Sequence, residues 1–338
     1  MPGYFRVNYD YHSWLSIKNF LNTDGYNKID VRNRAQLIDD AYYFMTQGYV
    51  SSTIFWGLAN YLKNDVNYIA WYPMFNILSF MWPVWDHPEA ELMKDRVRLM
   101  LDRLLEHLEY EERDGEDNMQ KTLRLLATRW ACKLGDMKCQ RVAARKLSRY
   151  LSDRNNENIF QPWWKDWVYS AGMILANENI AQILLEKYKI TKDIDMLKYL
   201  FCSDDVQIII KYRNEISSST MKNVLLHNDE IGLHLLIIKK HIRNPDLLEY
   251  YIRNYFKINL RQDSFLNTNL LGNMIMNVYL DDHFDIITNF TQDNAQLLKV
   301  KIDDIFVIER AQKKRIKKMQ NMIYVYSGIK KGKNIISE

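Results

Sequence analysis

The feature that most restricts the fold of this 338-residue chain is the spacing of its apolar residues. From residue 13 onward they recur every three or four positions, as on one face of an α-helix, in segments joined by short loops. In the segment 33–48, for example, Asn33 is suited to be an N-cap and Gly48 to end the helix. One residue of Ser51-Ser52-Thr53 can cap the next helix, and Pro73 is tolerable only in the first turn of the one after it. The spacing predicts an all-α fold.

Composition agrees with helices. The chain has only 11 Gly and 6 Pro, too few for a turn-rich sandwich, and its 47% hydrophobic residues exclude disorder for most of its length. Residues 4–9, rich in aromatic and β-branched types, are the one segment predicted as a strand. No apolar run is long enough for a transmembrane segment, and the first residues lack the apolar core of a signal peptide.

The positive charge is concentrated at one end. The chain carries a net charge of +4, but its last 30 residues contain nine Lys or Arg against two Glu, which is +7 and leaves −3 for the rest. A slightly acidic body argues against nucleic acid as a partner. For the basic end we predict a solvated helix end followed by a tail, with contact to an acidic surface as the alternative.

Two motifs near the start resemble a known family. Gly3-Tyr4-Phe5-Arg6-Val7-Asn8-Tyr9-Asp10 is followed by Asn33-Arg34-Ala35-Gln36-Leu37-Ile38-Asp39-Asp40-Ala41. In this order they resemble the C-terminal part of aminopeptidase N-type zinc metallopeptidases, which carry a "GYYRVNYD" strand, a "NRAQLIDDA" helix and then a long helical domain. Further along, Ala131-Cys132-Lys133-Leu134-Gly135 and Cys139 match the family's "ACxxGxxxC".

The resemblance implies both a fold and a domain division. The fold is a superhelical array of antiparallel helix pairs, a HEAT/armadillo-like solenoid bowl, with a compact bundle as the alternative. Residues 1–12 would be the remnant strand of a preceding β-domain, 13–326 the helical domain and 327–338 a basic, disordered tail.

The residues that carry the family's chemistry do not appear in this chain. The catalytic domain of the family binds zinc through His-Glu-x-x-His and a distant Glu. None of the seven histidines here begins that motif. His234 and His241 are seven residues apart and could share a helix face, but without an acidic partner nearby in sequence we favour surface or core roles. We predict no catalytic residue, metal site or cofactor here, with zinc in the catalytic domain of the full-length family.

Other site patterns point to ordinary structural roles. There is no Gly-rich phosphate loop, no Cys-x-x-Cys pair and no Gly-x-Ser-x-Gly elbow. The adjacent acids Asp39-Asp40, Asp204-Asp205 and Asp281-Asp282 are interpreted as helix N-terminal charge. The cluster of Trp163, Trp164 and Trp167 is interpreted as packing between helices, with a peptide-stacking wall as the alternative.

Three cysteines leave at least one thiol free or paired between chains. The family pairs the positions of Cys132 and Cys139, so the resemblance implies that disulfide here, in an oxidising compartment. Its second bond has no counterpart, because Ser170 stands where the partner of Cys202 would be. Cys202 is therefore predicted to be a free, buried thiol. The sequon at Asn289 predicts a glycan if the chain is secreted, with chance occurrence as the alternative.

The function implied is non-catalytic. The chain would cap the peptide-binding cavity of an aminopeptidase N-like metallopeptidase and shape peptide access, with the catalytic domain, in cis or in trans, and peptides as partners. By resemblance the location would be extracellular or at the plasma-membrane surface. The alternative is a degenerate, stand-alone helical scaffold, and an independent enzyme is disfavoured because the zinc motif is missing.

Overall fold

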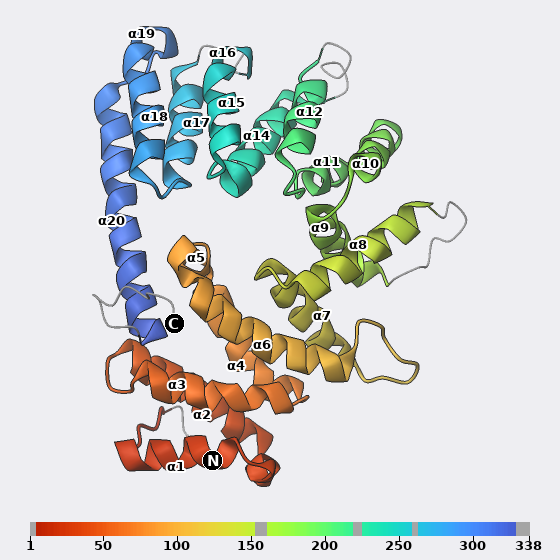
Figure 1. Ribbon diagram of the computed structural model, residues 1–338, viewed down its shortest axis with the longest axis vertical. Helices are drawn as coiled ribbons and strands as arrows, with labels where there is room; N and C mark the ends of the chain where they lie inside the picture. Colours follow the sequence, from red (N-terminus) through yellow and green to blue (C-terminus); the bar gives the residue numbers. More distant parts are fainter. Residues whose placement is uncertain (1–4, 153–160, 219–224, 259–262, 329–338) are drawn as a thin grey trace, which may run out of the picture. The chain divides into compact units, whose positions relative to one another are not determined.

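The computed structural model describes residues 5–152, 161–218, 225–258 and 263–328 (Figure 1). Over these ranges the chain consists of α-helices and short 3₁₀-helices with no strand, which confirms the all-α prediction. Within the same ranges, no helix combines the length and the apolar character needed to cross a bilayer.

The chain divides into two compact units. Unit 1 contains the described residues up to Cys139 together with those from Lys318 onward, and unit 2 contains Gln140–Lys317. Unit 1 contains α1 (Tyr11–Leu21), η1 (Asp24–Lys28), α2 (Val31–Thr46), α3 (Ser52–Ala59), η2 (Asn60–Asn64), α4 (Tyr68–Phe80), α5 (Trp82–Trp85), η3 (Pro88–Ala90), α6 (Glu91–Leu108) and α7 (Asn118–Lys133). Unit 2 contains η4 (Pro162–Trp164), α9 (Lys165–Ile174), α10 (Glu178–Thr191), α11 (Ile194–Leu200), α12 (Val206–Ile216), α14 (His227–His241), α15 (Pro245–Arg253), α16 (Tyr255–Ile258), α17 (Ser264–Met276), α18 (Asp281–Asp293) and α19 (Ala295–Leu298). Two helices belong to both units: α8 (Met137–Ser152) and α20 (Ile302–Ser327).

Unit 1 packs around large aromatic side chains. Helix α2 contacts α3 and α4, and α6 contacts α7 and η2. Trp71 of α4 is fully buried and donates from its indole nitrogen to the carbonyl oxygen of Asp65 at 2.6 Å. The last turns of α20 complete this unit, because the indole nitrogen of Trp56 donates to the carbonyl oxygen of Tyr326 at 2.6 Å.

Unit 2 is built from helices that contact one another in chain order. Helices α11, α14 and α17 form one row of contacts, and α12, α15 and α18 form a second (Figure 1). Each helix pair is therefore covered by the next, as in stacked helical repeats. The superhelical bowl for the whole chain stays a prediction.

The signals for helix ends were mostly interpreted correctly. Gly48 follows α2 with φ +80°, and the Ser51 side chain accepts from the backbone nitrogen of Ile54 at 3.3 Å, as predicted. The prediction of Asn33 as N-cap was wrong, because Asp30 accepts from the backbone nitrogen of Arg32 and the helix begins at Val31. An Asp side chain caps a helix as well as Asn does.

Two further predictions need correction. Pro73 lies in the interior of α4 rather than in its first turn, because Asn67 caps the helix and starts it at Tyr68. Pro73 itself is buried, as are Trp71 and Met74, and this packing keeps the turn helical although one backbone donor is missing. The predicted strand is also absent over residues 5–9, which form no ladder, and Tyr4 lies outside the described residues.

Candidate functional site

The two histidines singled out from the sequence lie in α14 and contact different partners. His234 is buried, with Nδ1 3.2 Å from the hydroxyl oxygen of Tyr251, and burial lowers its pKa to about 3. His241 places Nε2 2.9 Å from the carbonyl oxygen of Phe201, and burial likewise lowers its pKa. Both side chains therefore stay neutral at physiological pH and serve packing. The prediction that they lack an acidic partner nearby in sequence was wrong for His234, because Glu230, four residues earlier, places a carboxylate oxygen 4.0 Å from its Nε2.

The zinc that the family uses has no fitting ligand set in the described part of this chain. Within those residues, no group of three His, Cys, Asp or Glu side chains comes close enough to hold a metal ion.

The end of α7 and the start of α8 are joined by a disulfide. Cys132 and Cys139, the pair that the resemblance implies, are bonded with their Cα atoms 5.2 Å apart. The chain reverses between them at Gly135, whose φ of +90° favours glycine. The Asp136 carboxylate accepts from the backbone nitrogen of Cys139 at 2.7 Å and caps α8. The bond thus fixes a tight helix–turn–helix connection.

We expect thiol labelling under non-reducing denaturation of secreted material to modify one cysteine per chain, at Cys202. By loop entropy, closing this short loop stabilises the chain by about 2.5 kcal/mol. Cys132→Ser should lower the unfolding midpoint accordingly, whereas Cys202→Ala should leave it nearly unchanged. Labelling of three cysteines in secreted material would contradict the assignment.

Cys202 is buried and forms no disulfide among the described residues. Its sulfur lies 2.7 Å from Nζ of Lys240, and burial raises the pKa of the thiol. Ser170 donates its hydroxyl to the carbonyl oxygen of Asp166 at 2.6 Å, as an ordinary helix residue does. A protonated, buried thiol is a poor nucleophile, so this arrangement favours a structural role for Cys202.

The two N-terminal motifs contact each other. Asp40 of α2 is buried and accepts from the backbone nitrogen of Val7 at 3.1 Å and from Nη1 of Arg6 at 3.2 Å. Asp39 accepts from the same Arg6 nitrogen at 2.6 Å. The helix N-terminal role predicted for Asp39-Asp40 is therefore wrong, since both lie in the middle of α2 and hold the extended segment 5–10 against it.

The other sequence features lie where packing and capping place them. Asp205 caps α12, and Asp281 and Asp282 lie in the first turn of α18. Trp164 and Trp167 are buried and in edge-to-face contact 5.2 Å apart, whereas Trp163 is 46% exposed. The packing interpretation therefore applies to two of the three tryptophans.

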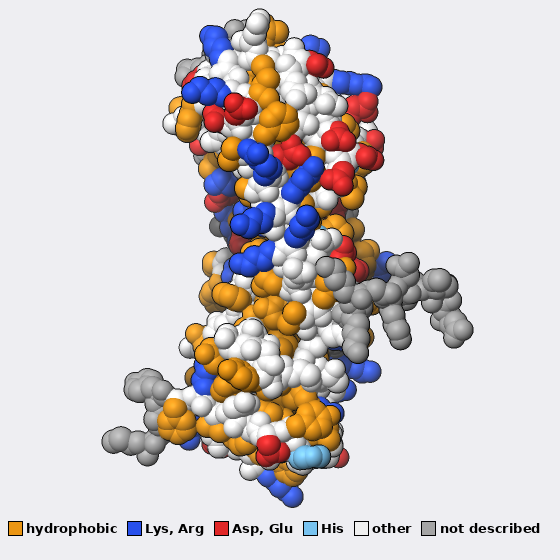
Figure 2. Space-filling model, turned by 90° about the vertical axis from the view of Figure 1, so that its left-hand side faces the viewer, with side chains coloured by type: hydrophobic (Ala, Val, Ile, Leu, Met, Phe, Trp, Pro, Cys, Tyr) orange, Lys and Arg blue, Asp and Glu red, His pale blue; other side chains and the backbone are white. Residues whose placement is uncertain are grey.

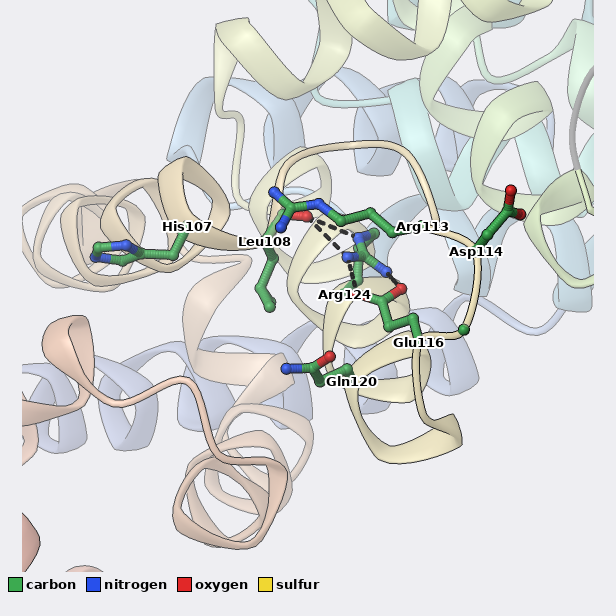
Figure 3. A pocket seen from close by; sticks show the side chains of 8 residues that line it. His107, Leu108, Arg113, Asp114, Glu116, Gln120 and Arg124 are labelled. Carbon is green, nitrogen blue, oxygen red and sulfur yellow. Dashed lines mark hydrogen bonds and ion pairs between the residues drawn. The ribbon is translucent and has the colours of Figure 1, made fainter.

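A pocket of about 220 Å³ beside the loop between α6 and α7 contains a buried arginine (Figure 3). Arg124 of α7 is 1% exposed. It donates from Nε and Nη2 to the carbonyl oxygen of Leu108 at 3.0 and 2.8 Å, and from Nε to that of Glu109 at 3.2 Å. Its two terminal nitrogens also donate to both carboxylate oxygens of Glu116.

These contacts make Arg124 a clamp rather than a ligand-binding group. The guanidinium fastens the C-terminal end of α6 and the following loop onto α7, and its hydrogen bonds hold the pKa of Glu116 below the usual range. Figure 3 shows Arg124 and Glu116 pointing at one another, while His107 and Asp114 point elsewhere. The sequence motifs did not reveal this clamp.

A second pocket in unit 1, of about 500 Å³, has a cationic lining without acids. Its charged side chains are Lys63, Arg96 and Arg103, and its apolar ones include Trp56 and Leu99. Such a lining suits an anionic group attached to an apolar one.

Comparison with known proteins agrees with the helical architecture and the N-terminal motifs. The pattern of the ERAP1-like C-terminal domain family matches residues 1–305. The thyrotropin-releasing hormone-degrading ectoenzyme of Rattus norvegicus is 24% identical over 310 residues, which cover 88% of this chain and 28% of that protein. Aminopeptidase N of Rattus norvegicus is 24% identical over 308 residues, which cover 87% of this chain and 31% of that protein. Aminopeptidase N of Homo sapiens is 23% identical over 309 residues, which cover 88% of this chain and 31% of that protein.

This chain therefore belongs to the ERAP1-like C-terminal domain family, which forms the C-terminal domain of aminopeptidase N-family proteins. It spans about three tenths of the length of these relatives.

Proposed function

We propose that this chain is the non-catalytic C-terminal domain of an aminopeptidase N-like zinc metallopeptidase, in which it caps the peptide-binding cavity and shapes peptide access. The observation that carries the proposal is the family match over residues 1–305, combined with coverage of only 28% to 31% of the peptidase relatives. The catalytic partner, in cis or in trans, would supply the zinc and the reacting groups.

The contact between the N-terminal motifs supports this role. Arg6 and Val7 are held by Asp39 and Asp40, so the extended segment leaves the helical body in a fixed direction. A catalytic part connected through this segment would be oriented with respect to α2. A cap needs such orientation, because it must close one particular cavity.

An extracellular or cell-surface location belongs to the same proposal. The thyrotropin-releasing hormone-degrading relative is named as an ectoenzyme, and the Cys132–Cys139 bond requires an oxidising compartment. Asn289 lies on the exposed side of α18, where a glycan would not disturb packing. We propose Asn289 as its attachment site, and a mass shift on glycosidase treatment tests it.

The 338-residue chain alone should neither retain stoichiometric zinc nor hydrolyse aminoacyl reporter substrates. Metal analysis of the purified chain and a reporter assay with and without chelator measure this. One tightly bound zinc per chain together with chelator-sensitive hydrolysis would show that the chain is an enzyme in its own right.

A chimera tests the cap directly. The matching region of rat aminopeptidase N is replaced by this chain, and hydrolysis is measured for a short reporter and for peptides of increasing length. We expect retained reporter turnover and an altered dependence on peptide length, because a cap limits access without touching the reaction. A folded chimera whose length dependence equals that of an enzyme lacking the region would instead support the stand-alone scaffold.

A further inference from the structure

Helix α20 carries an exposed row of basic side chains. Arg310, Lys314, Lys317 and Lys318 are all exposed, and their spacing of three and four residues places them on one side of this single helix. We call these four residues the α20 basic stripe. At 1.5 Å per residue it is about 12 Å long. Figure 2 shows Lys and Arg side chains gathered over the middle of the face along which α20 runs.

No carboxylate among the described residues neutralises the stripe. Lys313 lies beside the stripe and is not part of it. Its Nζ forms ion pairs with Glu309 at 2.8 Å and with Asp281 at 3.5 Å. The four stripe residues form no ion pair of this kind in the described ranges. Four like charges on one helix face repel one another, which destabilises the helix slightly unless an anion is bound there.

The stripe also differs from the rest of the chain. Residues 1–308 sum to −3, while five of the six residues from Lys313 to Lys318 are basic. Positive charge is therefore local and linear, which suits a long, narrow polyanion lying along the helix.

We propose that the α20 basic stripe binds a sulfated polysaccharide of the heparin class, with its sulfate groups contacting the four cations. A single glycan chain is narrow enough to follow the stripe without approaching the acidic surface beyond it. Short runs rich in Lys and Arg form such heparin patches in other proteins. This inference is independent of the peptidase role, and either one can fail alone.

The structure favours this partner over two other polyanions. The apolar side of α20 is already buried, with Ile305, Ile316 and Ile323 in the core, so the helix cannot insert into a bilayer as an amphipathic anchor does. The stripe itself contains no aromatic residue, and single-stranded nucleic acid binding relies on such side chains for stacking.

The test compares heparin binding of three forms of the full chain at about 0.15 M salt. The first is the unaltered chain, and the second replaces the four stripe residues with Gln. The third form, which we call the dispersed variant, replaces four exposed lysines outside the stripe with Gln, so that it loses the same charge. These are Lys192, Lys239, Lys257 and Lys301. Surface plasmon resonance on immobilised heparin gives Kd, and circular dichroism checks the fold of each form.

We expect the stripe variant to bind roughly 20-fold to several hundred-fold more weakly, since each exposed ion pair contributes a factor of about 2 to 5. The slope of log Kd against log salt should fall by about 3 to 4. The dispersed variant should lose much less affinity. N-desulfated heparin added in solution should compete poorly with immobilised heparin for the unaltered chain.

Three results would overturn the proposal. One is the absence of heparin binding by the unaltered chain, and another is an equal loss in the stripe and dispersed variants. The third is stripe-dependent binding of duplex DNA or of phosphatidylserine vesicles that is as tight as that of heparin.

Discussion

Replacing Arg124 with Met should lower the free energy of unfolding by about 3 to 5 kcal/mol, the range observed when one partner of a buried ion pair is removed. Met preserves most of the buried volume but donates no hydrogen bonds. The carboxylate of Glu116, 6% exposed, would then lose its ion-pair partner, and the carbonyl oxygen of Leu108 would lose its buried donor.

Urea unfolding of the full chain measures this effect as a shift of the midpoint at constant slope. Arg103→Met is the matched control, because Arg103 pairs with Glu106 on the surface and its loss should change stability by less than about 1 kcal/mol. The double variant Arg124→Met/Glu116→Leu should recover part of the loss, since no buried charge remains. Equal midpoints for Arg124→Met and Arg103→Met would show that the clamp contributes nothing.

The same pair makes stability depend on pH with a defined sign. Arg124 holds the pKa of Glu116 in the folded state below its usual value. Glu116 therefore contributes stability that is present above the unfolded carboxyl pKa of about 4.3 and lost as pH falls through the lowered folded-state pKa. Arg124→Met removes this contribution, so its midpoint should fall less on acidification than that of the unaltered chain.

Trp71→Ala should destabilise unit 1 by about 3 to 5 kcal/mol, the usual effect of truncating a large buried aromatic side chain. Trp71 is fully buried, and its ring lies 5.6 Å from that of Phe75. Its indole nitrogen also satisfies the carbonyl oxygen of Asp65, whose side chain forms a buried ion pair with Arg34 at 3.0 Å. The substitution thus opens a cavity and removes a buried hydrogen bond.

Two tryptophan controls separate these contributions in urea unfolding. Trp163→Ala, at a position 46% exposed, should have an effect smaller than about 1 kcal/mol. Trp71→Phe keeps much of the ring but loses the hydrogen bond, so its effect on the free energy of unfolding should lie between those of Trp163→Ala and Trp71→Ala. A midpoint for Trp71→Ala equal to that of Trp163→Ala would contradict this description of the core.

Local signals predicted local structure well. The helical spacing, Ser51 as a cap and Gly48 as a terminator depend on neighbours within a few residues, and the structure agrees with them. Pro73 was misplaced because the local signal that starts α4, Asn67 as its N-cap, was not recognised.

Long-range contacts were missed because a short sequence segment does not reveal them. Asp40 holds a segment 33 residues away, so no spacing rule connects the two. Arg124 did leave a signal: it stands three residues before Ala127 and seven before Ala131, on a helix face whose members Ala127, Thr128 and Ala131 are buried. An arginine at a core position of an amphipathic helix indicates a buried hydrogen-bonding role.

The order in which the two units occur along the chain has a consequence for biosynthesis. Unit 2 is one continuous stretch, whereas unit 1 is interrupted by it and resumes at Lys318. The bond from Trp56 to Tyr326 spans 270 residues, so the early helices of unit 1 leave the ribosome well before the last turns of α20 that complete their core. Unit 2 is free to fold during synthesis, while the early helices of unit 1 remain exposed to chaperones and proteases until the segment that contains Tyr326 has emerged.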